Sequence, residues 1–69
     1  MDDHALATTI KDRRRRLGVT QDELAALAGC SPRFISALES GKPSVRLDKL
    51  LAVLDALGLE LRVDLRRPR

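Results

Sequence analysis

The sequence is poor in aromatic residues, with Phe34 as the only one, and it contains one cysteine and one histidine. Without aromatic side chains to stack on bases, the chain is poorly suited to binding single-stranded nucleic acid. A lone Cys30 excludes an intramolecular disulfide and a zinc site built from cysteines. Since His4 is the only histidine, we also expect no metal site, no cofactor and no histidine-dependent catalysis.

Long apolar runs are also missing, so no segment could span a membrane, and no signal peptide is recognisable. We therefore expect a cytoplasmic protein that does not contact membranes. The 69 residues give room for one domain with a modest core. A chain this short has no room for a deep catalytic pocket, so we expect that it is not an enzyme.

The net charge of +3 is unevenly distributed along the chain. Basic residues outnumber acidic ones by eight to six up to Arg46, whereas acidic residues outnumber basic ones by four to two from Leu47 to Leu65. The tail at residues 66–69 is basic again, with three arginines and one proline. This distribution suits a face that binds a polyanion, backed by one that binds protein. From charge alone, the alternative is an ordinary solvated helix surface.

The spacing of apolar residues and the helix-capping residues predict four helices. The first covers residues 4–17. The second covers residues 21–28, because Thr20 and Glu23 have the spacing of a capping box. Gly29 is expected to end this second helix by adopting a left-handed conformation.

The third and fourth helices have equally clear ends. Ser31 is expected to cap the third helix, and Pro32 fits its first turn, where the missing N–H costs nothing. This helix ends before Gly41. The fourth carries an apolar stripe over residues 47–57 and is closed by Gly58.

The segment after the fourth helix changes period. Leu59, Leu61, Val63 and Leu65 alternate with charged residues, which predicts a β-strand over residues 59–65. A lone strand has no partner in its own chain, and its unpaired edge would be a liability. The simplest arrangement pairs it with the same strand of a second copy, in a twofold dimer.

Two helices joined by a tight turn are predicted within residues 21–38. Ala25 is small because the helices cross there, and Ile35 and Leu38 anchor the third helix from beneath. Its opposite face is then free to enter a DNA groove. The residues on that face are Ser31, Pro32, Arg33, Phe34, Ser36 and Ala37.

Over residues 10–57 the chain resembles the lambda-repressor-like, XRE-type helix-turn-helix family. The matching positions are Gln21, Leu24, Ala25, Gly29, Ile35, Leu38, Glu39 and Gly41. A closer resemblance is to HipB-like antitoxins. It rests on residues 13–14, 17–21, 33–35, 38–43, 46–49 and 54–59 and on the terminal strand.

These resemblances imply a mainly α fold, a bundle of four helices with the C-terminal strand paired between subunits. The chain divides into a DNA-binding domain at residues 1–58, a dimerisation strand at 59–65 and a basic tail at 66–69. The implied protein is a homodimeric repressor of a near-palindromic double-stranded operator, nucleoid-associated when bound to DNA. As an antitoxin it would autoregulate its operon and help neutralise a HipA-like kinase toxin.

Two alternatives stay open at this point. One is an antitoxin that acts mainly by docking its kinase through the acidic fourth helix, the strand and the basic tail, and that binds DNA weakly. The other is a free-standing phage-type regulator without a toxin. The presence of a neighbouring kinase gene separates the two.

Base readout is assigned first to Arg33, because an arginine near the start of a recognition helix can reach guanine O6 and N7. Its alternative role is a phosphate contact. Ser31 and Ser36 can bond a base edge or a phosphate, although Ser31 is also explained as a plain cap. The methyl group of Ala37 can touch thymine. Because Pro32 stands where the family usually has a polar reader, more of the specificity falls to DNA shape.

Phosphate contacts are assigned to the ends of helices. Gln21 opens the second helix, where family members bond a phosphate and where the helix dipole favours an anion. Thr20 and Lys42 are further candidates, and Arg46 is a weaker one. Phe34 either covers the edge of the turn or packs on the DNA backbone or a thymine methyl.

An ion pair is implied by the family between Arg14 and Glu39, where it fixes the recognition helix. The alternative places Arg14 on DNA. The neighbouring Arg13, Arg15 and Arg16 are interpreted as a solvated face, with contact of one of them to a phosphate or to the toxin as the alternative.

Overall fold

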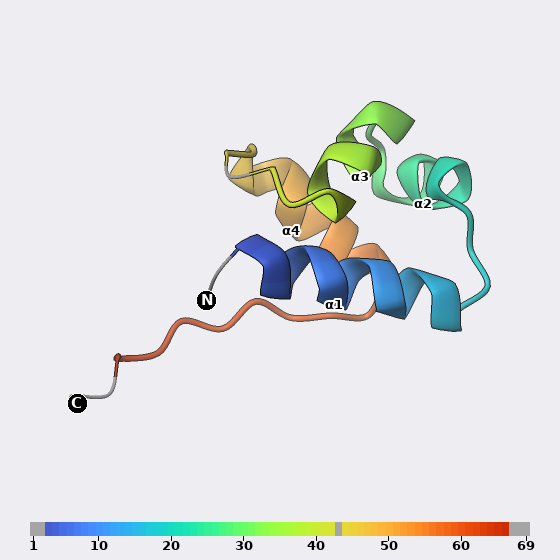
Figure 1. The fold of residues 1–69 in the computed structure, drawn as a ribbon. Coiled ribbons are helices and arrows are strands. Elements are labelled where there is room, and N and C mark those ends of the chain that lie inside the picture. The colour runs from blue at the N-terminus through green and yellow to red at the C-terminus, as the bar shows by residue number, and fades with distance from the viewer. Residues whose placement is uncertain (1–2, 43, 67–69) are drawn as a thin grey trace.

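A computed structural model describes residues 3–42 and 44–66 and shows four helices (Figure 1). They are α1 (Asp3–Arg16), α2 (Gln21–Ala28), α3 (Pro32–Glu39) and α4 (Leu47–Ala56). The predicted four-helix, mainly α fold is thus confirmed. Residues 1–2 of the predicted domain and residues 67–69 of the predicted tail lie outside the described residues. No helix in the described part of the chain is long and apolar enough to cross a bilayer.

The ends of α2 and α3 follow the predicted capping chemistry. The Thr20 hydroxyl accepts a hydrogen bond from the Glu23 N–H, and the Glu23 carboxylate accepts one from the Thr20 N–H, both at 3.0 Å. Gly29 ends α2 with a left-handed φ of +72°, a conformation open to a residue without a Cβ. The Ser31 hydroxyl accepts a hydrogen bond from the backbone three residues on, at 3.1 Å, and Pro32 opens α3.

A single apolar core lies between the four helices. α2 packs against both α3 and α4, and α1 packs against α3. The buried core residues are Ile10, Leu24, Ala25, Ile35, Leu38, Leu50, Val53, Leu54 and Leu57. Ile35 and Leu38 therefore hold α3 from beneath, as predicted. Leu17, the last residue of the predicted first helix, lies just beyond the end of α1 at Arg16 and is exposed.

Arg13 has a structural role that its sequence context did not predict. Its Nε donates a hydrogen bond to the Leu57 carbonyl at 2.8 Å, although Arg13 was interpreted as part of a solvated face. Carbonyls at the end of a helix lack partners within the helix, and the helix dipole favours a cation there. The contact therefore ties α1 to the C-terminal end of α4.

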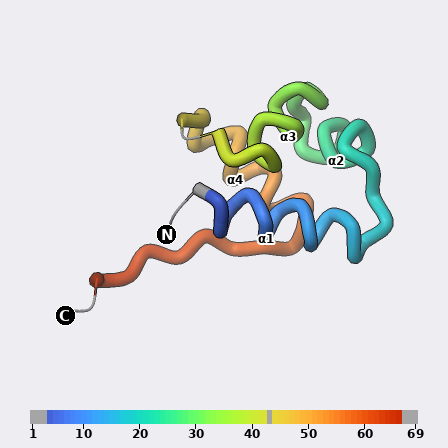
Figure 2. Tube along the Cα trace, in the orientation of Figure 1, coloured from blue at the N-terminus to red at the C-terminus, as the bar shows by residue number. Residues whose placement is uncertain are grey.

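The predicted strand at residues 59–65 is wrong for the single chain, since no strand forms in the described part of it. After α4 the chain runs back along α1 as an extended segment (Figures 1 and 2). Leu59 and Leu61 pack partly buried against the core, whereas Val63 and Leu65 are 96% and 91% exposed. A strand needs a hydrogen-bonded neighbour. The described residues supply none for this segment, and a pairing between two copies is not part of this single-chain structure.

Candidate nucleic-acid interface

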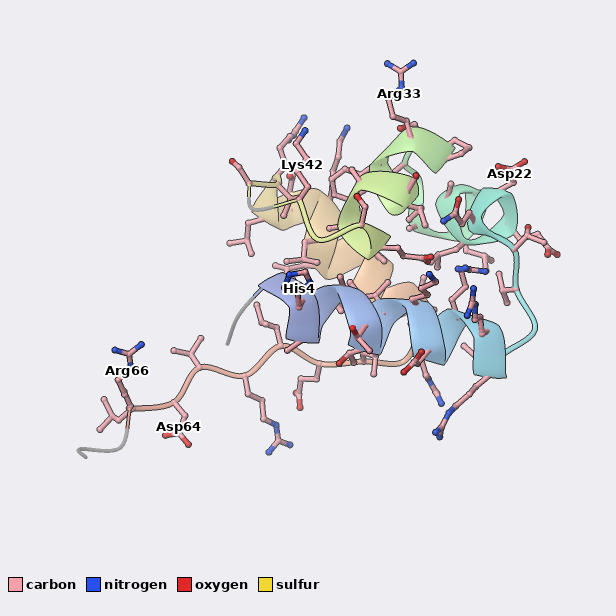
Figure 3. The ribbon with its side chains drawn as sticks, viewed as in Figure 1. His4, Asp22, Arg33, Lys42, Asp64 and Arg66 are labelled. Carbon is pink, nitrogen blue, oxygen red and sulfur yellow. The ribbon has the colours of Figure 1, made fainter. Side chains whose placement is uncertain are left out.

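The outward face of α3 carries the residues assigned to base readout. Ser31, Arg33 and Ser36 are exposed, and Ala37 is half-buried. In Figure 3 the Arg33 side chain points away from the helical bundle, and Lys42 projects from the same side of the molecule. Because Ile35 is buried on the opposite face, α3 presents these side chains as a fixed set.

A groove of about 470 Å³ runs between α3 and the segment that leads into α4. Its lining residues are Ser31, Arg33, Phe34, Ala37, Lys42, Ser44, Val45, Arg46 and Lys49. The lining therefore contains four basic residues and no carboxylate. Six of the nine residues predicted to contact DNA lie around it, all except Thr20, Gln21 and Ser36. Its composition suits a polyanion.

The predicted ion pair between Arg14 and Glu39 is present, and Gln21 also hydrogen-bonds to Glu39. Arg14 Nε and Nη2 donate to the two carboxylate oxygens of Glu39 at 2.6 and 3.0 Å. The side chains of the pair are 12% and 3% exposed. Gln21 Nε2 also donates to Glu39, at 3.1 Å, and Arg14 Nη1 donates to the Val19 carbonyl at 2.9 Å. One carboxylate thus joins α1, α2 and α3.

The protonation of this network follows from its hydrogen bonds. Burial by itself raises the pKa of Glu39, but the hydrogen bonds from Arg14 and Gln21 outweigh it, so the pKa lies below its ordinary value. The hydrogen bond to Glu39 raises the pKa of Arg14. Both partners are therefore charged at neutral pH. They hold the recognition helix against α1 and α2.

The two residues at the start of α2 that were predicted to contact phosphate, Thr20 and Gln21, form hydrogen bonds within the chain. Gln21 gives its amide N–H to Glu39, and the Thr20 hydroxyl is used in the capping box. A phosphate contact by Gln21 would therefore use the second N–H of its side-chain amide or its backbone N–H. The spacing of Gln21 and Glu39 could not have indicated their contact, because it depends on how α2 and α3 cross.

Phe34 packs against the protein in this chain. It is half-buried at the edge of the core, and Lys49 Nζ lies 5.8 Å from the centroid of its ring. Lys49 was not among the predicted contacts. Arg46 was, but its guanidinium donates to Asp48 at 2.7 and 3.1 Å. This hydrogen bonding lowers the pKa of Asp48.

Neither a thiol site nor a metal site is indicated. Burial raises the pKa of the Cys30 thiol, which disfavours the reactive thiolate. The described residues contain no group of three or more histidine, cysteine, aspartate or glutamate side chains that could hold a metal ion.

A small helical bundle that presents one exposed helix beside a carboxylate-free basic groove has the architecture of a helix-turn-helix domain. Residues 10–63 match the family model described as Helix-turn-helix, and the chain belongs to this family. The family implies DNA binding.

Two relatives carry related names. The chain is 44% identical over 50 residues to an uncharacterized HTH-type transcriptional regulator of Sinorhizobium fredii, covering 72% of this chain and 66% of that protein. It is 40% identical over 55 residues to an uncharacterized HTH-type transcriptional regulator of Methanothermobacter thermautotrophicus, covering 80% of each. The match thus spans slightly less than two thirds of the first relative.

Proposed function

We propose that the protein is a sequence-specific transcriptional repressor that binds a near-palindromic operator as a homodimer. The observation that carries this proposal is the placement of Arg33 on the exposed face of α3, beside a basic groove lined by six of the predicted contact residues. The names of the two relatives support a role in transcription. The residues shared with HipB-like proteins support an antitoxin that autoregulates its operon and helps neutralise a HipA-like kinase.

The Arg33→Ala variant tests this function. Binding to the protein's own upstream DNA is measured at about 0.15 M salt with nonspecific competitor DNA. Since a bidentate arginine–guanine contact is worth about 1–3 kcal/mol, operator affinity should fall about 5- to 150-fold per subunit of the dimer. Affinity for unrelated duplexes should change much less.

The matched control is Arg16→Ala, which removes an exposed arginine from α1. Equal weakening by Arg33→Ala on every sequence would make Arg33 a phosphate contact and would contradict the assignment to base readout. If the wild-type protein binds no DNA sequence in preference to others, the proposal that it is a sequence-specific repressor is contradicted.

The C-terminal segment supports the homodimer. Its period-two apolar side chains continue beyond the core of their own chain, since Leu59 and Leu61 pack inward while Val63 and Leu65 extend into solvent. Beside Leu61, a cleft of about 110 Å³ lies between this segment and Leu6 of α1. A second copy related by a twofold axis would cover the exposed half of each stripe and pair the two segments as strands.

Val63→Asp should convert dimers into monomers in light scattering. Val63 touches almost nothing in its own chain, so the substitution removes apolar area from the interface and leaves the monomer's core intact. Arg62→Ser, on the opposite face of the same segment, is the control and should stay dimeric. A Val63→Asp protein that remains dimeric would place the interface on the helices instead.

A second candidate function is an antitoxin that acts mainly through protein contact. It is favoured by the outer face of α4, where the exposed Leu47 and Leu51 lie one turn apart and Asp55 is exposed nearby. Titrating the wild-type protein into its upstream DNA separates the two candidate functions. An antitoxin that acts mainly through protein contact would bind DNA weakly and without a preferred operator. A free-standing phage-type regulator would have no kinase gene beside it.

A further inference from the structure

Two basic side chains near the start of α4 have different surroundings. Arg46 is exposed, and two of its nitrogen atoms donate to the two carboxylate oxygens of Asp48. Its positive charge is therefore balanced by a partner two residues away. To bind a phosphate, Arg46 would have to give up or share this carboxylate. Replacing the Asp48 carboxylate with a phosphate would therefore add little to the free energy of DNA binding.

Lys49, one turn along α4, is half-buried and has no carboxylate partner among the described residues. Its ammonium lies 5.8 Å from the centroid of the Phe34 ring. A cation over an aromatic face is attracted by the ring's quadrupole, and this contact uses none of its capacity for charge-assisted hydrogen bonds. The ring therefore limits the motion of the lysine and leaves its N–H groups available to an anion.

The groove around Lys49 is suited to one anion class. Lys42 and Arg33 line the same groove, whose walls contain no acidic side chain. The groove also lies beside the N-terminal end of α4, the positive end of the helix dipole. Arg33 belongs to α3, the helix proposed to read the bases, so the groove lies directly beside that helix. A DNA backbone phosphate next to the recognition helix meets all these conditions.

We infer that Lys49, supported by the Phe34 ring, is the principal phosphate contact of α4, and that Arg46 is not. This inference rests on the proposed DNA-binding function. Phe34 then acts on DNA through Lys49 rather than by packing on sugar or thymine. The bidentate Arg46–Asp48 pair serves the start of α4 itself.

The test compares Lys49→Gln with Arg46→Gln in the full chain, measuring binding to the operator and to a random duplex between about 50 and 200 mM salt. Each phosphate contact contributes about 0.9 to the slope of log affinity against log salt. Lys49→Gln should lower the slope by about 0.9 per subunit and weaken binding about fivefold per subunit at 0.15 M, equally on both DNAs. Arg46→Gln should lower the slope by less than about half as much.

Two further variants sharpen the result. Lys49→Arg keeps the charge and should restore the wild-type slope. Phe34→Leu keeps an apolar side chain at the edge of the core but removes the ring. If the ring acts through Lys49, Phe34→Leu should weaken DNA binding more when Lys49 is present than when it is made in the Lys49→Gln variant. Thermal unfolding checks that each variant is folded.

The outcomes separate two failures. If the wild type binds duplex DNA but Lys49→Gln keeps the wild-type slope, or Arg46→Gln lowers it as much, the inference is overturned and the repressor stands. If the wild type binds no duplex at all, the proposed function itself has failed, and this is visible before any variant is measured.

Discussion

Replacing Glu39 with glutamine should lower the free energy of unfolding at pH 7 by about 2–3 kcal/mol. The substitution keeps the size of the side chain but removes the charge that pairs with Arg14, which is only 12% exposed. It also weakens the acceptor for Gln21. For a domain of this size, the loss corresponds to a melting temperature lower by about 10–20 °C, measurable by circular dichroism.

The pH dependence of this loss has a definite sign. The pKa of Glu39 lies below its ordinary value of 4.5 in the folded chain, so the folded state binds the proton less tightly than the unfolded state. The stabilisation is therefore fully present above pH 4.5 and is lost as the pH falls through the folded-state pKa. The difference in stability between wild type and Glu39→Gln should be constant near neutrality and shrink in acid.

Glu60→Gln is the matched control, since Glu60 pairs with Arg62 at 3.1 Å while both side chains are largely exposed. An exposed ion pair contributes about 0–1 kcal/mol, so this change should have little effect. The lowered pKa values of Glu23 and Asp48 are common to wild type and variant and cancel in the difference. A Glu39→Gln effect as small as the control, or one that persists undiminished in acid, would contradict the assigned role.

The helix ends were predictable because their interactions are local. Thr20 and Glu23 are three residues apart, and the Ser31 hydroxyl bonds a backbone group at the same separation, so one short stretch of sequence contains both partners. The left-handed Gly29 is equally local. The inward position of Ile35 followed from helical spacing, which needs no knowledge of the partner helix.

Contacts between distant residues were predictable only where a family resemblance supplied them. The Arg14–Glu39 pair, 25 residues apart, came from the resemblance alone. The contact between Arg13 and the Leu57 carbonyl spans 44 residues and has no sequence signature, since any surface arginine on α1 would look the same. Lys49 over Phe34 depends likewise on how α4 lies beside α3.

The strand at residues 59–65 shows a different limit. The alternation of apolar and charged residues correctly indicates an extended segment with one apolar face, and Leu59 and Leu61 do pack inward. A period of two describes which side chains share a face, but a strand also needs a neighbour for its backbone. The sequence pattern shows which side chains share a face, but it does not show whether the backbone has a hydrogen-bonded neighbour.

Ile35→Ala should be among the most destabilising single substitutions in the chain, at about 2–5 kcal/mol. Ile35 is fully buried at 0% exposure and anchors α3 in the common core of the helices. The whole domain is expected to be stable by only about 3–10 kcal/mol, from roughly 0.05–0.15 kcal/mol per residue. The variant should therefore lose a large share of its stability, measured by urea and thermal unfolding.

Leu27→Ala is the control, because the same kind of truncation at a side chain that is 68% exposed on α2 should change stability by no more than about 0.5 kcal/mol. Ile35 also sets the position of Arg33 on the opposite face of α3. Operator affinity of Ile35→Ala should therefore fall further than its folded fraction alone predicts, since the cavity lets α3 shift. Affinity that simply follows the folded fraction would show that the Arg14–Glu39 pair holds the recognition helix without help from the core.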